Sequence, residues 1–288
     1  MSTVDVPTRI KLKNILFATD FSPAADAAIP YAAELAKRYG AKLFALHVRP
    51  SATVMMGLPG SQTDAEKAIK AEAEHDERDI LTSFPAVRPE VLIREGEIWS
   101  NFETVISEHK IDLIVMGTSG RSGIAKLLLG SVAEEVFRKA SCPVLTVGPR
   151  SFIWPRLRGE FTRILFATDL SDGAVAAPYA ISLAQEYQTY LTLLHVIEHH
   201  EATDSRCTER LQNLVLPEAE LWCVPEYVVE PGEPADKILE IATRRKVDLI
   251  VMGAHEPGAF PSVATHLPMT TAHKVVSQAA CPVLTVRR

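Results

Sequence analysis

The sequence has few cysteines, no long apolar run and no excess of positive charge, and each of these absences excludes a class of protein. Four cysteines in 288 residues, with no C-x-x-C pair, are too few and too scattered for a disulfide framework. No apolar run approaches the roughly 20 residues of a membrane span. The opening segment MSTVDVPTRIKLK has no apolar core of the kind found in a signal peptide, so we expect a cytoplasmic protein.

The charge balance argues against a nucleic-acid partner. The formal net charge is −6, and the lysines and arginines are dispersed rather than gathered in a basic stripe. Apolar residues make up 47% of the chain and charged residues 23%, which is typical of a globular protein rather than a disordered one. The length suits two domains of ordinary size, each able to bury a core.

An internal repeat organises the chain. NILFATDFSPAADAAIPYAAELAKRYGAKLFALHV, from residue 14, returns from residue 163 as RILFATDLSDGAVAAPYAISLAQEYQTYLTLLHV, with one residue deleted near Pro178. IDLIVMG at 111–117 returns as VDLIVMG at 247–253, and CPVLTV at 142–147 returns at 281–286. We therefore predict a tandem duplication, with domains at 1–148 and 162–288 and a linker at 149–161.

Strand and helix patterns alternate within each copy. In the first copy, apolar runs at 15–18, 91–94, 111–116 and 143–147, and another that ends at 48, alternate with helical patterns. The helical patterns end near Tyr39 or span 64–81, 97–109 and 131–140, with Ser22 as an N-cap and Gly40 as a stop for the first of them. This alternation predicts an α/β fold with a parallel sheet and right-handed crossovers.

A glycine-rich loop follows the apolar strand at 111–116. The segment IDLIVMGTSGRSGIAKLLLGS has the spacing G-x2-G-x9-G-S, which is neither a Walker A loop nor G-x-G-x-x-G. Glycine lets backbone N–H groups converge on an anion, and the helix that follows adds unpaired donors and the positive end of its dipole. Arg121 and Lys126 in this loop are candidates to face phosphates. The pattern predicts an anion site.

Two residues near this site have two interpretations each. Ser131 and Glu134 form a capping-box pattern, so Ser131 either only caps the helix or caps it and also contacts phosphate. Asp20 follows the first strand, where an aspartate either organises the turn or hydrogen-bonds a ligand. We favour a ligand for Asp20 because Ser22 already supplies the helix cap.

These segments resemble the universal stress protein family, in its tandem form, along essentially the whole chain. The resemblance rests on the ILFATDFS first strand with its aspartate, the LHV second strand, the IVMG fourth strand, the glycine loop and the CPVL fifth strand. It implies two tandem Rossmann-like domains, each a five-stranded parallel sheet with helices on both faces. It also implies ATP binding in members with the full glycine motif.

The resemblance also implies positions for the nucleotide. Thr19, Asp20 and Val48 would flank the adenosine. Ribose and phosphates would be held by Met116, Gly117, Gly120, Gly130, Ser131 and Val132. Magnesium could arrive with the phosphates. These positions agree with the independent rule that ligands bind beyond the carboxyl ends of the strands in an open α/β sheet.

The second copy departs from the glycine motif. Where the first copy has Gly130, Ser131 and Gly120, the second has Met269, Thr270 and Glu256. A methionine side chain obstructs close backbone approach, and a carboxylate repels phosphate. We predict that the first copy binds nucleotide and that the second binds it weakly or not at all.

Histidines and cysteines suggest a metal site, but their spacing does not. One stretch of the second copy contains His199, His200, Cys207 and Cys223. This spacing matches no zinc pattern, so we expect no metal site. His47 and His195 occupy the same strand-end position in the two copies, which favours a shared structural hydrogen bond over catalysis.

We interpret the chain as a nucleotide-binding regulatory protein of the stress response, in which ATP in the first domain biases a conformation or a partner interface. A slow ATP hydrolase or phosphotransferase stays open, although its only candidate residues are Asp20, Arg121 and Lys126, with no recognisable base. A nucleotide-free scaffold for dimerisation is the third possibility. We expect the two copies to pack as an intramolecular pseudo-dimer through their CPVLTV strands, and whole chains could pair further as a homodimer.

Overall fold

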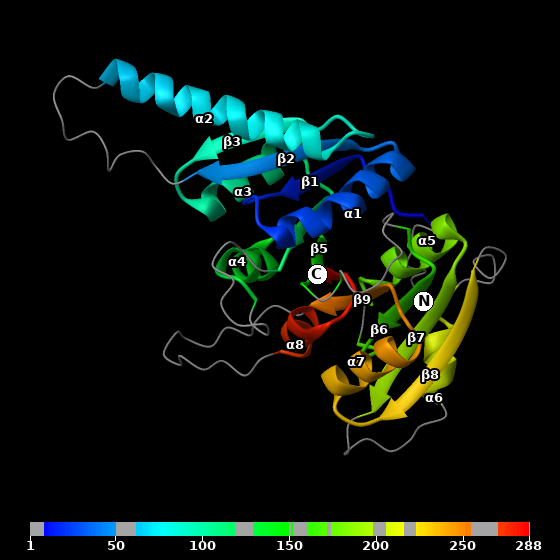
Figure 1. The fold of residues 1–288 in the computed structure, drawn as a ribbon. Helices are drawn as coiled ribbons and strands as arrows, with labels where there is room; N and C mark the ends of the chain where they lie inside the picture. Colours follow the sequence, from blue (N-terminus) through cyan, green and yellow to red (C-terminus); the bar gives the residue numbers. More distant parts are fainter. Residues whose placement is uncertain are drawn as a thin grey trace, which may run out of the picture.

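The computed structural model describes residues 9–49, 62–118, 129–149, 151, 160–171, 174–197, 206–215, 223–254 and 270–287. These residues form two similar halves of alternating strands and helices, one up to residue 149 and one from residue 160 (Figure 1). The first half contains β1 (Asn14–Ala18), α1 (Pro23–Tyr39), β2 (Lys42–Arg49), α2 (Gln62–Ser83), β3 (Glu90–Glu95), α3 (Ile98–His109), β4 (Leu113–Gly117), α4 (Ser131–Lys139) and β5 (Val144–Val147). The second half contains β6 (Arg163–Ala167), α5 (Ala177–Tyr187), β7 (Tyr190–Ile197), α6 (Arg206–Gln212), β8 (Val224–Pro231), α7 (Pro234–Arg244), β9 (Leu249–Ala254), α8 (Thr271–Gln278) and β10 (Val283–Arg287).

All the described strands belong to one sheet. Its order is β3-β2-β1-β4-β5-β10-β9-β6-β7-β8. Neighbouring strands within each half are parallel, so the predicted five-stranded parallel sheet per half is confirmed. At the centre β5 and β10 pair antiparallel, with Leu145 opposite Leu284. The two CPVLTV segments therefore join the halves edge to edge.

Reciprocal hydrogen bonds reinforce this central junction. The hydroxyl of Thr146 donates to the carbonyl of Val283 at 3.1 Å, and the hydroxyl of Thr285 donates to the carbonyl of Val144 at 3.2 Å. Both threonines are buried. The equivalence of the two bonds gives the junction a local two-fold symmetry.

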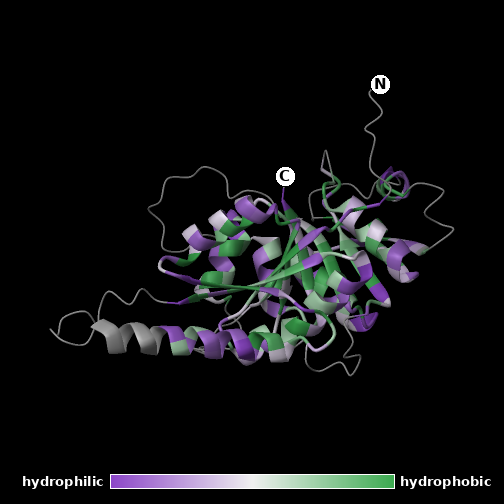
Figure 2. Ribbon diagram, turned by 90° about the horizontal axis from the view of Figure 1, so that it is seen from above, coloured by the Kyte–Doolittle hydropathy of each residue, from purple (hydrophilic) through white to green (hydrophobic). Residues whose placement is uncertain are grey.

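Helices cover both faces of the sheet. One apolar layer packs α1, α2, α5 and α6 against the strands, and the other packs α3, α4, α7 and α8. Figure 2 shows the hydrophobic strands at the centre, with hydrophilic residues on the outer surfaces of the helices. Each layer contains residues of both halves, so the core continues across the junction.

The first helix begins and ends where its sequence predicts. Ser22 is the N-cap of α1, and its side chain accepts a hydrogen bond from the amide of Ala25. Gly40 ends the helix with a left-handed φ of 62°, a conformation that glycine adopts without steric cost. Among the described residues, no helix is long and apolar enough to cross a membrane.

Candidate functional site

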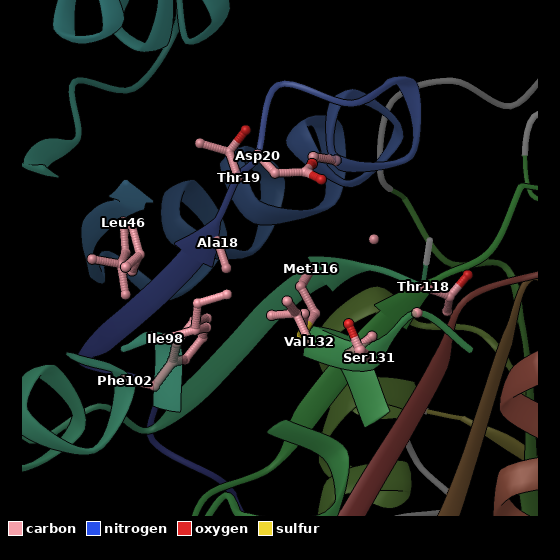
Figure 3. Close-up of a pocket in the computed structure, with 15 residues that line it drawn as sticks. Ala18, Thr19, Asp20, Leu46, Ile98, Phe102, Met116, Thr118, Ser131 and Val132 are labelled. Carbon is pink, nitrogen blue, oxygen red and sulfur yellow. The ribbon is translucent and has the colours of Figure 1, made fainter. Parts of the chain in front are cut away.

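A pocket lies at the carboxyl ends of β1, β2 and β4 in the first half, between α1 and the first turns of α3 and α4 (Figure 3). The predicted residues that line it are Thr19, Asp20, Val48, Met116, Gly117, Gly130, Ser131 and Val132. Gly120, Arg121 and Lys126 lie outside the described residues. Segments far apart in the sequence are thus brought to one site by the sheet order.

The turn after β1 is held by its own side chains. The hydroxyl of Thr19 accepts a hydrogen bond from the amide of Phe21, and the Asp20 carboxylate accepts one from the amide of Ser22, both at 3.0 Å. Phe21 has a φ of 58°, which a residue with a side chain seldom adopts without such support. Asp20 therefore does organise the turn, which is the interpretation that the sequence analysis did not favour. A ligand bond from Asp20 stays a prediction.

The second half repeats this turn. The Asp169 carboxylate accepts a bond from the amide of Ser171 at 2.9 Å, and Leu170 has a φ of 57°. Because the turn recurs in the half that lacks the glycine motif, it belongs to the fold and does not depend on the pocket.

The paired histidines also support this turn. Nδ1 of His47 donates to the carbonyl of Thr19 at 2.8 Å, and Nδ1 of His195 donates to the carbonyl of Thr168 at 3.0 Å. A carbonyl only accepts, so this nitrogen of each ring carries the proton. The predicted structural hydrogen bond is confirmed in both halves.

Gly117 lets α1 approach the end of β4. A Cβ at this position would lie 2.6 Å from the carbonyl carbon and oxygen of Ala24, and 2.8 Å from the amide nitrogen of Ala25. Any side chain would therefore push the start of α1 away from the pocket. At the equivalent Gly253 a Cβ would meet none of the described residues within 4 Å.

The start of α4 differs from the predicted capping box. Gly130 is the N-cap, its amide donates to the carbonyl of Thr118 at 2.7 Å, and Ser131 is the first helical residue. The capping-box prediction is wrong, because a residue already in the helix cannot fold its hydroxyl back over the first turn. Within the described part of the chain, no side chain caps α4. The first N–H groups of this helix therefore face the pocket without a capping side chain.

The opposite wall of the pocket is apolar. It includes Leu46, Ile98 and Phe102, which the sequence analysis did not select. In Figure 3 these side chains gather at one end of the pocket, and Ser131 and Thr118 lie toward the other. Ile98 and Phe102 lie four residues apart at the start of α3, so one face of that helix meets the pocket. Their helical spacing was a visible signal, but only the sheet order places that face at the site.

The pocket can therefore hold a molecule with two different ends. The apolar wall suits a flat ring, and the uncapped helix start suits an anionic group. Asp20 is the only titratable side chain among the described lining residues. Its negative charge disfavours an anion beside it and suits hydroxyl groups, which donate hydrogen bonds to a carboxylate.

The corresponding region of the second half is built differently. Helix α5 begins at Ala177, which aligns with Ala28 of α1, so the first turns of α1 have no helical counterpart among the described residues. The hydroxyl of Thr270 accepts a hydrogen bond from the amide of His273 at 3.2 Å and caps α8. The start of α8 therefore has a side-chain cap, whereas the start of α4 has none among the described residues. Met269 and Glu256 lie outside the described residues.

The described histidines and cysteines do not form a metal site. No group of three or more His, Cys, Asp or Glu that could hold a metal occurs in the described ranges, and His199 and His200 fall outside them. Cys207 and Cys223 are buried and are not joined by a disulfide bond. Burial raises the pKa of the Cys142 thiol to about 12. This cysteine is therefore protonated and poorly nucleophilic near neutral pH.

Known proteins resemble the chain in both sequence and fold. The model of the universal stress protein family matches residues 11–148 and 160–287. A universal stress protein of Methanocaldococcus jannaschii is 33% identical over 139 residues, which are 47% of this chain and 81% of that protein. One from Thermus aquaticus is 33% identical over 136 residues, which are 47% of this chain and 98% of that protein.

A solved structure shares the two-half architecture. The crystal structure of a universal stress protein from Archaeoglobus fulgidus superposes with a TM-score of 0.74 at 22% identity. The superposition covers 97% of this chain and 100% of that one, so the fold is shared over nearly the whole length. Because the family model matches both halves, the chain belongs to the universal stress protein family and contains its domain twice.

Proposed function

We propose that the chain is an adenine-nucleotide-binding regulatory protein of the stress response, with ATP bound in the pocket of the first half. The observation that carries the proposal is the start of α4, where Gly130 replaces a capping side chain and Ser131 and Val132 line the pocket. A helix start without a side-chain cap attracts phosphate through its N–H groups and its dipole.

The rest of the pocket suits the remainder of a nucleotide. The apolar wall formed by Leu46, Ile98 and Phe102 fits the adenine ring. Asp20 fits the ribose, whose hydroxyls donate hydrogen bonds, better than it fits the phosphates. Magnesium would accompany the phosphates, which supply most of its ligands in such sites.

Binding is favoured over catalysis by the lining of the pocket. Phosphoryl transfer needs a positioned base, a metal-holding carboxylate and a cation that stabilises the transition state. The described lining offers Asp20 alone, and this carboxylate already accepts a hydrogen bond from Ser22. ATP then acts as a switch to the extent that it binds one conformation better than another.

Two measurements test this proposal. Nucleotide content is determined by chromatography of protein purified without added ligand, and ATP with magnesium is then titrated by calorimetry. We expect one nucleotide per chain, loss of most binding in Gly130→Met, and unchanged binding in the control Gly253→Ala, whose new methyl group meets no described residue within 4 Å. No binding at millimolar ATP contradicts the proposal. Rapid release of ADP in a product assay favours the hydrolase instead.

We also propose that the two halves are an intramolecular pseudo-dimer. The antiparallel pairing of β5 with β10 and the reciprocal bonds of Thr146 and Thr285 support this proposal. Sedimentation of the purified chain should then give a species of 31.6 kDa. A species of twice that mass would instead reveal a homodimer with a second interface.

A further inference from the structure

Helix α4 connects the pocket to the other half of the molecule. Its N-terminal residues line the pocket, and its C-terminal end contacts the last described residue of β10. There the guanidinium of Arg287 donates a hydrogen bond to the carbonyl of Arg138. The same guanidinium lies over the ring of Phe137, with its central carbon 5.6 Å from the ring centre. One helix is thus in contact with the pocket at one end and with the second half at the other.

The central junction of the sheet creates this contact. Because β5 and β10 pair antiparallel, the end of each strand lies beside the C-terminus of a helix in the opposite half. In Figure 1 the C-terminal end of the chain accordingly lies between the two halves. At the equivalent place Gly148 follows β5, where a Cβ would lie 3.6 Å from the carbonyl oxygen of Ala279, the C-cap of α8.

The two equivalent places differ in charge. Arg287 brings a cation to the end of α4, whose last turn also contains Arg138 and Lys139. The place beside α8 holds Gly148, and the last turn of α8 has no basic residue. A cation at a helix C-terminus stabilises the last carbonyl groups and the helix dipole. Among the described residues, α4 receives a cation from the opposite half at its C-terminus, and α8 does not.

Helix α4 needs support from its surroundings. It has nine residues, and an isolated helix shorter than about 12 residues is marginal in water. Its orientation therefore depends on what holds each end. A small tilt would move the amide groups at its start, and hydrogen bonds weaken steeply once donor and acceptor lose alignment.

We propose that Arg287 is a positioning residue for the pocket in the opposite half. Through its contact with Phe137 and Arg138 it holds α4 in the orientation that aims the N-terminal amides at the ligand. This inference rests on the proposed nucleotide binding. By thermodynamic reciprocity, a nucleotide that holds α4 also strengthens the contact with Arg287, so occupancy of the first half is transmitted to the second.

Arginine substitutions in the full-length chain test this role. ATP affinity is measured by calorimetry for Arg287→Ala, Arg287→Lys and the control Arg244→Ala. Arg244 is an exposed arginine of the second half that pairs with Glu230 on β8 and with Glu240 on α7. We expect the Kd to rise about three- to tenfold in Arg287→Ala, to stay within about twofold in Arg287→Lys, and to be unchanged in the control. If Arg287→Ala does not fold, Arg287→Gln, which keeps a donor without the charge, takes its place.

Hydrogen exchange without nucleotide gives a second readout. The amides of α4 should exchange faster in Arg287→Ala than in the unmodified chain, and those of α3 should not change. Unchanged ATP affinity together with unchanged exchange in α4 overturns the inference. Unchanged affinity with faster exchange also overturns it, because α4 would then be loosened without effect on the ligand. If the unmodified chain binds no nucleotide, the proposed function fails, and faster exchange in α4 would still establish that Arg287 holds the helix.

Discussion

Gly117 lies directly against the backbone of Ala24, so the end of β4 and the start of α1 touch where a side chain would otherwise stand. The added methyl group of Gly117→Ala would collide with main-chain atoms, which cannot rotate away as a side chain can. We expect this substitution to lower the free energy of unfolding by about 1–3 kcal/mol. Urea denaturation measures the change.

The second half contains a matched control for this substitution. Gly253→Ala places the same methyl group where none of the described residues lies within 4 Å, so the free energy of unfolding should change by less than about 0.5 kcal/mol. Equal losses in the two variants would show that the approach of α1 to β4 does not need glycine.

The threonines of the central junction should contribute equally to stability. Thr146→Val and Thr285→Val each remove a buried hydroxyl donor and leave a carbonyl of the opposite strand without it. Each loss should cost about 1–2 kcal/mol in the free energy of unfolding. Thr104→Val on the exposed face of α3 is the control and should cost less. Clearly unequal losses at 146 and 285 would contradict the local two-fold symmetry.

Two helix starts can be distinguished by one pair of substitutions. Thr270→Ala removes the side chain that caps α8, so the free energy of unfolding should fall by about 1 kcal/mol. Ser131→Ala removes a hydroxyl that caps nothing, so stability should change little while ATP affinity falls. Chemical denaturation and calorimetry measure the two effects. A stability loss in Ser131→Ala as large as that in Thr270→Ala would restore the capping box.

Acid should loosen the start of α3. The amides of Ser100 and Trp99 donate to the Glu97 carboxylate and lower the pKa of that carboxyl below its ordinary value. Because the carboxyl of Glu97 has a lower pKa in the folded protein than in the unfolded one, it contributes its full stabilisation at a pH above its pKa in the unfolded protein. This contribution is lost as the pH falls through its pKa in the folded protein. The melting temperature of Glu97→Gln should therefore depend less on pH below about 4.5 than that of the unmodified chain. Parallel acid dependence in the two proteins would contradict this role of Glu97.

Local patterns predicted most of the fold. Buried strands such as 144–147 and 283–287 are short apolar runs that can be recognised in the sequence of each copy. Because the run occurs in both copies, each occurrence supports the other. Ser22 and Gly40 were predicted as helix ends because a cap depends on residues only a few positions away. A structural hydrogen bond was predicted for His47 and His195 because the two copies share this histidine, and the structure supplies the partners, the carbonyls of Thr19 and Thr168.

The features that sequence patterns did not predict depend on contacts between distant segments or on competing local hydrogen bonds. Gly130 rather than Ser131 caps α4 because its amide bonds to the carbonyl of Thr118, on the far side of the glycine loop. Ile98 and Phe102 reach the pocket because β3 lies beside β2 in the sheet, and the spacing of residues within α3 does not contain that order. The turn role of Asp20 was weighed but not favoured, and its carboxylate accepts a hydrogen bond from the amide of Ser22, whereas a ligand bond from Asp20 stays a prediction.

The two strands that pair at the centre of the sheet, β5 and β10, belong to one chain, and this determines which two halves are paired. Two separate chains joined along such a strand would dissociate on dilution and exchange partners, and every re-formed pair would consist of identical members. A single covalent chain keeps its two members at an effective concentration that dilution does not change. The halves can therefore accumulate different substitutions without separating, as the different starts of α4 and α8 illustrate.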